Sequence, residues 1–498
     1  MEGGGNLWRR IYEAKTKDPL ALPAVSSLMQ VNNNKMHEQT QMHDIVIHMT
    51  LSGVNLHVAV KNHNATNSVA RQIDPDKAVA KEMPSEKQVT LTLKDLRLHA
   101  YGVFSNVYRG VLISPTPQRE VAIKKTWRSA RVRNFETIFL SGVGRPRHKS
   151  IIEVLYTWEN RYEEEVDGKS TVKVCESFVF PFSTCTLNAL IRLKPMDITD
   201  IRIYTWQLFD GLLYLHDRRI AHRDIKPANL LMDPNGGRLT ISDFGSAKFI
   251  STSHTSVTYQ VSRFYRPPEI LFGSAYYSAA IDVWSAGCVT GEMMRGSVLF
   301  QGRDTNHQMK LIFSAFGLPS QDEVRSWLSP TTLNPGTYKG KPTGLAYLIP
   351  RAKPEWLEFL GKILVYRPKE RLCGRQLLDD KFFDPIFQKG AHRSNGMLIS
   401  SSIITEDDRM KARIPLENKD RKIYERLAKK LQNDYHEAAK EKEKHVTLVV
   451  EHDNTTIAKE ELSEAHKKEA VYLHTDHSNQ SSSQLNVSSP KTSQNIVE

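Results

Sequence analysis

Apolar and polar residues alternate in two short runs near the start of this chain. Apolar side chains occupy every second position over residues 45–51, and the alternation resumes over residues 54–60 after a Ser-Gly pair. Residues two apart share one face of a β-strand, so the pattern predicts a β-hairpin over 45–60. The residues on either side are polar without a lasting period, which predicts a partly disordered N-terminal extension over 1–88.

A strand-rich segment is followed by a helix-rich one. Val89, Leu91 and Leu93 alternate with polar residues, and Val121-Ala122-Ile123 is another strand candidate. After residue 187 the apolar spacing changes to that of amphipathic helices. A β-rich part before an α-rich part predicts an α+β fold with two lobes, over residues 89–388. The helices are predicted over residues 203–215, 281–298, 308–317 and 355–366.

The C-terminal residues 389–498 differ in composition from the rest. Residues 407–445 are dense in Lys, Glu, Arg and Asp and carry a narrow apolar stripe, which predicts one amphipathic helix. A solvated charged helix without a partner fits the same pattern. The segment after Asp476 is rich in Ser, Asn and Gln, which predicts disorder. The apolar stripe consists of Ile423, Tyr424, Leu427, Leu431 and Tyr435.

Composition narrows the classes of function. The chain of 498 residues has a net charge of +12, which is modest for this length and gives no strong indication of a nucleic-acid partner. No stretch approaches the ~20 apolar residues of a membrane span. The four cysteines form no CxxC pair, so no zinc site is predicted, and no apolar leader follows the first residues. We therefore expect a cytoplasmic or nuclear protein.

The strongest chemical signal is the loop His222-Arg223-Asp224-Ile225-Lys226-Pro227-Ala228-Asn229. Fourteen residues later follows Asp243-Phe244-Gly245. Phosphoryl transfer from ATP needs a carboxylate to accept the hydroxyl proton, oxygen ligands for Mg²⁺ and a cation for the developing charge. Asp224 fits the role of the base, and Lys226 fits the role of the cation that offsets the developing charge. Asn229 and Asp243 offer the hard oxygens that suit Mg²⁺.

With these motifs the chain resembles the eukaryotic protein kinases over residues 90–386. The resemblance implies a bilobal fold, with ATP bound between a small β-rich lobe and a larger helical lobe. It implies that Lys124, which ends a Val-Ala-Ile-Lys run, grips the α and β phosphates and pairs with Glu136. The structural anchors of the large lobe that it implies are Glu269, Asp282 and Arg371, with Arg371 expected to pair with Glu269.

The loop expected to cover the phosphates departs from the family pattern. The glycine-rich motif aligns with residues 100–105, where only Gly102 remains and Ala100 and Ser105 replace the outer glycines. Glycine lets the backbone approach phosphates closely, so a loosened grip on ATP is predicted. Plain core packing would also explain the apolar residues nearby. The other ATP contacts that the resemblance implies are Val107, Ala122, Lys124 and Leu231, with Phe180 at the gatekeeper position and Ser183 in the hinge.

The activation segment resembles that of the glycogen synthase kinase-3 family. The resemblance rests on Ser246-Ala247-Lys248, on the run from Val257 to Arg266, and on the run from Ile281 to Val289. It implies a serine/threonine kinase that acts on protein substrates. It also implies that Tyr259 is phosphorylated, with Arg263 and Arg266 placed to hold its phosphate.

One substrate-binding feature of that family is incomplete here. A primed substrate carries a phosphoserine four residues beyond its target, and the family binds that phosphate with three basic residues. Arg223 and Lys248 match two of them, but Phe135 stands in the third place. A weakened preference for primed substrates is therefore predicted.

A hypothesis from another class remains open. The altered loop at residues 100–105 also fits a pseudokinase scaffold that binds partners through the helix near 300–320 or the stripe within 407–445. The complete set of Lys124, Asp224, Asn229 and Asp243 opposes it. The sequence therefore predicts an active kinase that uses ATP and Mg²⁺, with a scaffold or regulatory protein as a further partner and no nucleic acid.

Overall fold

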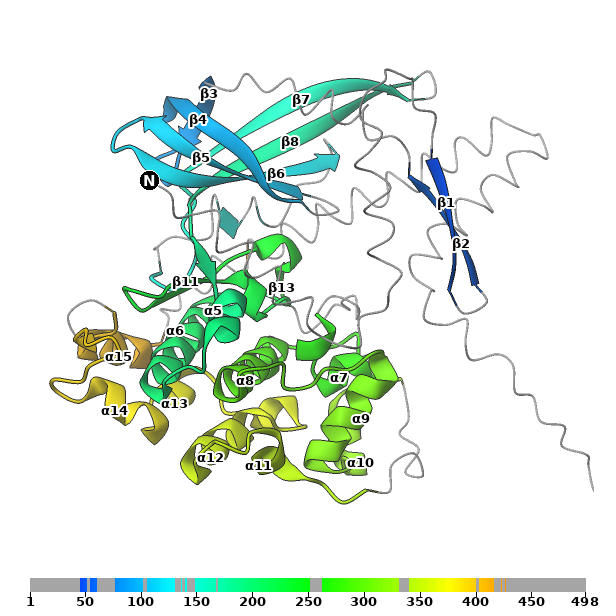
Figure 1. The fold of residues 1–498 in the computed structure, drawn as a ribbon, viewed down its shortest axis with the longest axis vertical. Helices are drawn as coiled ribbons and strands as arrows, with labels where there is room; N and C mark the ends of the chain where they lie inside the picture. Colours follow the sequence, from blue (N-terminus) through cyan, green and yellow to red (C-terminus); the bar gives the residue numbers. More distant parts are fainter. Residues whose placement is uncertain are drawn as a thin grey trace, which may run out of the picture. The chain divides into compact units, whose positions relative to one another are not determined.

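The computed structural model describes most of the central part of the chain. For the strands at residues 45–51 and 54–60 it gives the backbone. The further described residues are 77–101, 105–129, 136, 139–140, 148–166, 169–250, 262–330, 340–399, 403–415, 422 and 426. The chain divides into two units, Met1–Asp74 and Pro75–Glu498. In the first unit, β1 (Ile45–Leu51) and β2 (Val54–Val60) pair antiparallel (Figure 1).

The second unit begins with a closed β-barrel, which is the small lobe. Its strands follow the order β3-β4-β5-β6-β8-β7, and neighbouring strands are antiparallel. Strand alternation turns Leu91, Leu112 and Val179 into the barrel, where they are fully buried. The strands are β3 (Lys77–Glu82), β4 (Gln88–Tyr101), β5 (Ser105–Ser114), β6 (Arg119–Ser129), β7 (Tyr156–Val166) and β8 (Lys169–Pro181).

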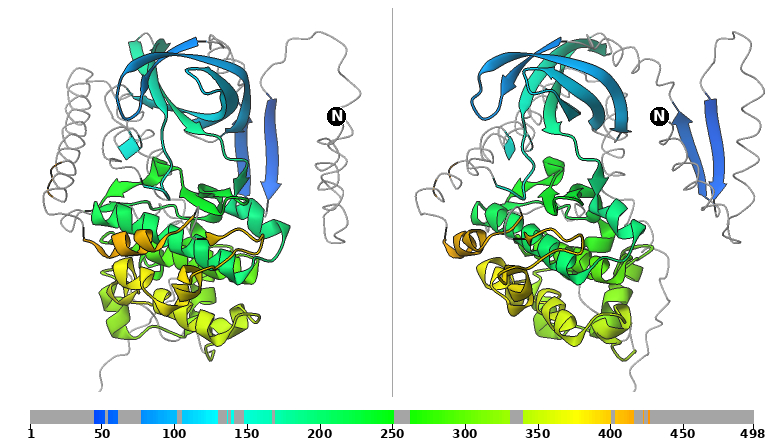
Figure 2. Two further views of the ribbon diagram at one scale, coloured as in Figure 1. Left: turned by 90° about the vertical axis from the view of Figure 1, so that its left-hand side faces the viewer. Right: turned by 60° about the vertical axis from the view of Figure 1, so that its left-hand side comes forward.

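Helices make up most of the large lobe (Figures 1 and 2). α6 and α8 pack against each other, and their buried side chains include Trp206 and Trp284. None of the helices in the described part of the chain is long and apolar enough to cross a membrane. The helices are α5 (Leu187–Leu193), α6 (Ile198–Asp217), α7 (Pro268–Leu271), α8 (Ala280–Arg295), α9 (Thr305–Phe316), α10 (Gln321–Ser326), α11 (Gly344–Leu348), α12 (Pro354–Ile363), α13 (Gly374–Leu378), α14 (Asp384–Phe387) and α15 (Glu406–Arg413).

A buried ion pair ties α7 to the segment before α13. Arg371 donates to both carboxylate oxygens of Glu269, each at 2.7 Å, and both side chains are almost fully buried. The expected pairing of these two residues is therefore confirmed. A bidentate geometry satisfies the planar guanidinium and the carboxylate together, which a buried pair requires.

The ends of the predicted helices follow local sequence signals. α8 ends at Arg295 because Gly296 adopts φ +83°, and the N–H of Gly296 donates to the carbonyl of Glu292 at 2.8 Å. Glycine takes this left-handed conformation at little cost. The helix predicted over 281–298 is therefore present but ends earlier than predicted.

The helix predicted over residues 407–445 is not continuous, and that prediction was wrong. α15 ends at Arg413, and Ile414 is extended, with φ −82° and ψ 121°. The ring of Pro415 disfavours the helical conformation of the residue before it, so the helix ends there. The chain is helical again at Lys422 and Arg426. The stripe residues themselves lie outside the described residues.

Short strands position the loops between the lobes. β9 (Cys185–Thr186), β11 (Leu230–Asp233) and β12 (Arg238–Ile241) form a small sheet, and β10 (Ile220–Ala221) pairs with β13 (Lys248–Phe249). The loop with the strongest chemical signal connects β10 to β11, and the Asp-Phe-Gly segment follows β12. Both segments are therefore held at their ends by paired strands.

Candidate active site

Lys124 stands between two carboxylates. It lies on β6, in register with Val107 of β5 and Phe178 of β8. Its Nζ lies 2.9 and 2.7 Å from the two carboxylate oxygens of Glu136 and 2.8 Å from Oδ1 of Asp243. The expected pairing of Lys124 with Glu136 is present, and Asp243 joins it from the large lobe.

The charges of this group support one another. Burial alone would lower the pKa of Lys124, but Glu136 and Asp243 outweigh burial and raise it. Burial would raise the pKa of Asp243, but Lys124 outweighs burial and lowers it. Burial also raises the pKa of Glu136 in spite of Lys124, yet the two short contacts to Lys124 identify an ionised pair. Lys124 therefore keeps its proton, and Asp243 stays ionised.

Gly245 lies close against the same charged group. A Cβ atom at this position would lie 3.4 Å from Oδ1 of Asp243 and 3.8 Å from Nζ of Lys124. These are ordinary van der Waals distances, so Gly245 packs against the charged group without the space itself requiring a glycine.

Three side chains donate hydrogen bonds to Asp224. Its Oδ2 accepts from Lys226 Nζ at 2.7 Å and from Asn229 Nδ2 at 3.0 Å, and its Oδ1 accepts from Ser262 Oγ at 2.6 Å. Asn229 Nδ2 also donates to the backbone carbonyl of Asp224 at 2.9 Å. Because Asp224 is only 9% exposed, these bonds fix the direction of its carboxylate. One of its oxygens faces a hydroxyl group.

Asp282 of α8, in the large lobe, holds the loop that carries Asp224. Its two carboxylate oxygens accept the backbone N–H groups of His222 and Arg223, each at 2.8 Å. His222 Nε2 lies 3.0 Å from the carbonyl of Ser242, and its ring meets the ring of Phe244 edge-on, with centroids 4.9 Å apart. The base loop and the Asp-Phe-Gly segment are therefore fixed to each other.

Asn229 and Asp243 are the candidate metal ligands. Asn229 uses its amide nitrogen in the bonds to Asp224, which leaves its Oδ1 available, and Asp243 is about half exposed. An amide oxygen and a carboxylate suit Mg²⁺, which takes its remaining ligands from water and substrate phosphates. Within the residues that the structure describes, no three His, Cys, Asp or Glu side chains cluster to form a complete metal site. The oxygens of Asn229 and Asp243 therefore fit a cation that binds together with phosphates.

The residues expected to surround the adenine lie on strands beside the hinge. Val107 lies on β5, and Ala122 on β6 stands opposite Phe180 on β8. Leu231 lies on β11. Ser183 Oγ donates to the carbonyls of Cys185 at 3.0 Å and Met232 at 3.3 Å, which ties the hinge to that strand. Gly102 lies outside the described residues.

Arg223 and Lys248 lie close together. Burial, followed by the charge of Arg223, lowers the pKa of Lys248. Arg223 Nε donates to the carbonyl of Ser246 at 2.6 Å, and its Nη1 donates to the hydroxyl of Tyr277 at 3.2 Å. Phe135, the third position of the expected phosphate site, lies outside the described residues. Lys248 also pairs in register with Ala221, two residues before Arg223, so two of the three expected positions lie in the same part of the fold.

The expected tyrosine-phosphate site is only partly visible. Tyr259 lies outside the described residues. Arg263 donates from Nη1 to the carbonyl of Arg303, and Arg266 is only 5% exposed. The contact of these arginines with a phosphate on Tyr259 therefore stays a prediction.

Two residues in this site were missed by the sequence analysis. Ser262 bonds Asp224 from a point 38 residues further along the chain. Tyr277 bonds Arg223 from 54 residues away. Ser262 lies within the run from Val257 to Arg266, but a serine between two motifs carries no signal of its own. Only the fold shows which atoms it reaches.

The two lobes, the Lys124–Glu136 pair of the small lobe and the buried carboxylate of Asp224 define the class: a protein kinase. A family model described as protein kinase domain matches residues 100–383. The chain is 34% identical over 319 residues to gskl-1 of Caenorhabditis elegans, named as a serine/threonine-protein kinase, over 62% of this chain and 84% of that protein. It is 33% identical over 273 residues to protein kinase gsk3 of Schizosaccharomyces pombe, over 54% and 68% of the two chains. It is 32% identical over 305 residues to glycogen synthase kinase 1 of Pyricularia oryzae, and the match covers 60% of this chain and 75% of that protein.

The chain belongs to the protein kinase family, in its glycogen synthase kinase-3-like branch. It is a serine/threonine kinase that phosphorylates proteins with ATP. The resemblance seen in the sequence is therefore confirmed, and nothing favours the pseudokinase hypothesis over it.

Proposed function

We propose that Asp224 is the base of this kinase and that its Oδ1 accepts the proton of the substrate hydroxyl. The observation that carries the proposal is the bond from Ser262 Oγ to this oxygen at 2.6 Å. It marks a position from which a hydroxyl donates to Asp224, while Lys226 and Asn229 occupy the other oxygen. A carboxylate oriented in this way directs the attacking hydroxyl.

Lys226 and Lys124 have separate electrostatic roles in this proposal. Lys226, 2.7 Å from Asp224, is placed to offset negative charge on the phosphoryl group during transfer. Lys124 binds the α and β phosphates of ATP, and Glu136 orients its ammonium group. Asp243 contacts Lys124 in the structure. The Lys124–Asp243 pair therefore links the position of the nucleotide to the position of the metal.

Asn229 and Asp243 would hold Mg²⁺, on the fit of their oxygens described above. Bound there, the ion would neutralise phosphate charge and orient the phosphates. The purine would lie against Val107, Ala122 and Leu231, with Phe180 behind it and Ser183 in the hinge beside it. Gly102 would cover the phosphates.

A purified-protein assay tests the assignment. Wild-type protein with Mg-ATP and a peptide should transfer labelled phosphate to serine or threonine, whereas Lys124→Met and Asp224→Asn should not. Replacing Mg²⁺ by EDTA should abolish transfer. Equal labelling by wild type and Asp224→Asn would reject Asp224 as the base.

Substrate choice is proposed to differ from that of the family. Arg223 and Lys248 offer two cationic donors for a priming phosphate, and Phe135 offers none. A phosphate with nearly two charges needs several donors to replace its water. We expect a weak preference for primed peptides. A phosphate on Tyr259, held by Arg263 and Arg266, would open the substrate site. Mass spectrometry of the active enzyme tests whether Tyr259 is phosphorylated.

We propose a cytoplasmic or nuclear location for the kinase. The four cysteines are free thiols in the structure, as a reducing cytoplasm or nucleus favours. Imaging of the tagged chain tests this location. A scaffold or regulatory protein that binds the large lobe should be recovered by cross-linking in cells.

A further inference from the structure

The hairpin of β11 and β12 joins the two candidate metal ligands. Asn229 directly precedes β11, and Asp243 follows the last residue of β12 by two positions. The pairing of the strands continues toward these residues, because Ser242 donates from its N–H and from its hydroxyl to the carbonyl of Asn229, each at 2.9 Å. A shift of the hairpin would therefore move both candidate ligands together.

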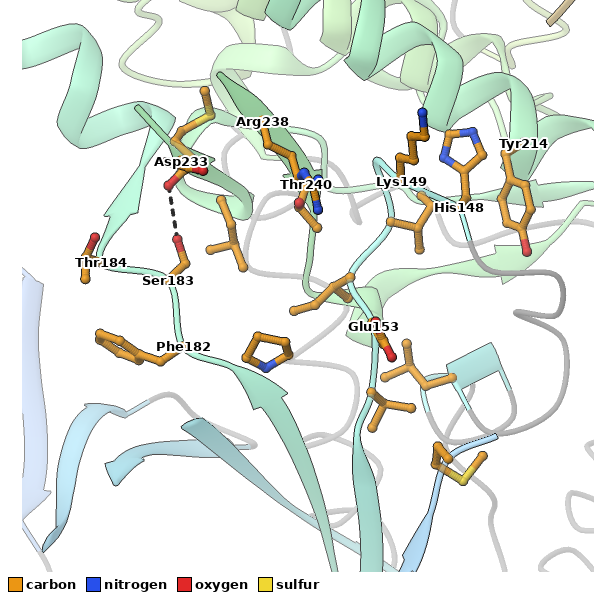
Figure 3. A pocket seen from close by; sticks show the side chains of 18 of the residues that line it. His148, Lys149, Glu153, Phe182, Ser183, Thr184, Tyr214, Asp233, Arg238 and Thr240 are labelled. Atoms are coloured by element: carbon orange, nitrogen blue, oxygen red, sulfur yellow. Dashed lines mark hydrogen bonds between the residues drawn. The ribbon is translucent and has the colours of Figure 1, made fainter. Parts of the chain in front are cut away.

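One side of this hairpin lines a cavity. The cavity has a volume of about 630 Å³, and its wall includes the hinge residues Phe182–Thr184 (Figure 3). Asp233, Arg238 and Thr240 of the hairpin also lie along it (Figure 3). Side chains that face empty space lack neighbours to pack against, so the cavity does little to hold the hairpin in place. The hairpin therefore needs support from other parts of the large lobe.

Arg393 holds the turn at the far end of the hairpin. Its Nη1 donates to the carbonyl of Asn235 at 2.7 Å, and its Nη2 donates to the carbonyl of Pro234 at 3.0 Å. Its Nε binds Oδ1 of Asp200 at 2.7 Å, and Nη2 also donates to the hydroxyl of Tyr204 at 2.9 Å. Asp200 and Tyr204 both belong to α6. The guanidinium of Arg393 therefore connects the turn of the hairpin to this helix.

The contact between the turn and Arg393 is close and buried. Arg393 is only 5% exposed. Gly237 in the turn has φ +74°, and a Cβ atom there would lie 2.7 Å from Cδ1 of Ile403 and 3.0 Å from Cζ of Arg393. Glycine takes this left-handed conformation easily and leaves room for both side chains. The planar fork of a guanidinium can bind two carbonyls and a carboxylate at once, which a lysine ammonium cannot do.

The turn that carries Arg393 is itself fixed to α6. Within residues 391–399, the N–H of Gly396 donates to the carbonyl of Arg393 at 2.9 Å, which closes a tight turn. Ser394 Oγ donates to Oδ2 of Asp200 at 2.9 Å, so one carboxylate binds two neighbouring residues of this turn. The match to the family model of the kinase domain ends at residue 383. The support of the hairpin thus comes from a segment beyond the matched domain.

We infer that Arg393 is a positioning residue for the Mg²⁺ site and acts through the β11–β12 hairpin. The inference rests on the proposed assignment of Asn229 and Asp243 as Mg²⁺ ligands. Arg393 holds the turn against α6, so the opposite end of the hairpin keeps the spacing of the two ligand oxygens. Without Arg393 the turn would be free to move toward the cavity, and Mg²⁺ would contribute less to nucleotide binding.

Calorimetric titration of the full-length chain with ADP tests this role without phosphoryl transfer. The Kd for ADP in EDTA divided by the Kd in saturating Mg²⁺ measures how much the metal contributes to binding. Loss of a side chain that holds a metal ligand directly weakens metal binding about 10–100-fold. Arg393 is further from the ligands, so Arg393→Ala should lower the ratio by about three- to tenfold. A purely structural role would change both Kd values alike, so an unchanged ratio would overturn the inference.

Arg409→Ala is the matched control. Arg409 of α15 also ties the segment beyond the kinase domain to the large lobe, but it binds Asp379 at 3.3 Å and Asp384 at 2.9 Å. This variant should lower the melting temperature, as Arg393→Ala does, and keep the ratio of the wild type. An equal fall of the ratio in both variants would show that any loosening of the segment weakens binding, and the specific role of Arg393 would be wrong.

Two further variants keep the test decisive. Arg393→Lys retains the buried charge and loses the fork, so it should lower the ratio in the same direction even if Arg393→Ala does not fold. A wild-type ratio in Arg393→Lys would then reject the inference. Asp243→Asn should lower the ratio more than either variant. If it does not change the ratio, the metal assignment fails and the role of Arg393 fails with it. If only Asp243→Asn lowers the ratio, the metal assignment stands and the role of Arg393 is rejected.

Discussion

The loop around Asp224 and the strand ends that flank residues 102–104 differ in how firmly they are held. Asp224 and Asn229 are nearly buried, and each has several hydrogen-bond partners. In contrast, Tyr101 at the end of β4 is 85% exposed, and the β4–β5 register shifts between Leu98 and Ala100. The large lobe therefore holds the proposed base firmly, whereas the strand end beside the loop expected to cover the phosphates is exposed and irregular, so we expect the grip on the nucleotide to be adjustable. Changes in the first region should act on kcat and changes in the second on KM.

The largest effect should come from breaking the fixed region. Asp224→Asn keeps the shape of the side chain but removes the proton acceptor, so kcat should fall by about 10²–10⁴-fold with little change in the KM for ATP. Steady-state kinetics on a serine peptide measure both. Asp322→Asn, an exposed aspartate of α10, is the control and should behave as wild type. A loss confined to KM would contradict the comparison.

The substrate-phosphate site should respond next. Phe135→Arg adds a charged donor beside Arg223 and Lys248, and a hydrogen bond to a charged group is worth about 1.5–3 kcal/mol, or roughly 10- to 100-fold. The kcat/KM for a primed peptide should rise by that factor, while the matched unprimed peptide stays unchanged. Phe135→Leu is the apolar control. Strong priming in wild type that Phe135→Arg does not alter would mean that another residue fills the site.

Ser262 offers a smaller test of the fixed region. Ser262→Ala removes the donor to Oδ1 of Asp224, so the carboxylate is less well directed and kcat should fall by up to about tenfold. The KM for ATP should not move. Ser262→Thr restores a hydroxyl and should recover most of the rate. A change in the KM for ATP alone would show that Ser262 belongs to the nucleotide site.

The smallest expected effect concerns the adjustable region. Ala100→Gly with Ser105→Gly should lower the KM for ATP by roughly two- to fivefold, or about 0.5–1 kcal/mol for the pair, because glycine lets the backbone approach the phosphates more closely. The kcat should stay the same. Ser105→Ala removes the hydroxyl without adding backbone freedom and is the control. An unchanged or higher KM would show that the loop already has the shape that ATP needs.

Much of this molecule was readable from its sequence, but contacts across the chain were not. The strands from Val89 and the helix α8 depend on local patterns, although the predicted helix ran past Gly296. The roles of the Asp224 loop stay predictions. The pairing of Arg371 with Glu269 was expected only because the family resemblance supplied it. Ser262 and Tyr277 were missed because their partners are set by the fold. At Pro415 the local effect of proline on the preceding residue outweighs the charge density and helical spacing that predict one continuous helix.

The buried pair between Glu269 and Arg371 has a consequence for synthesis of the protein. The two residues are 102 positions apart. At about 5–20 residues per second, a ribosome needs roughly 5–20 s to deliver Arg371 after Glu269. During that interval the carboxylate and the apolar surfaces of α7 and α8 lack the segment that closes over them. Translation pauses between these two codons would lengthen the period in which chaperones must shield the nascent large lobe.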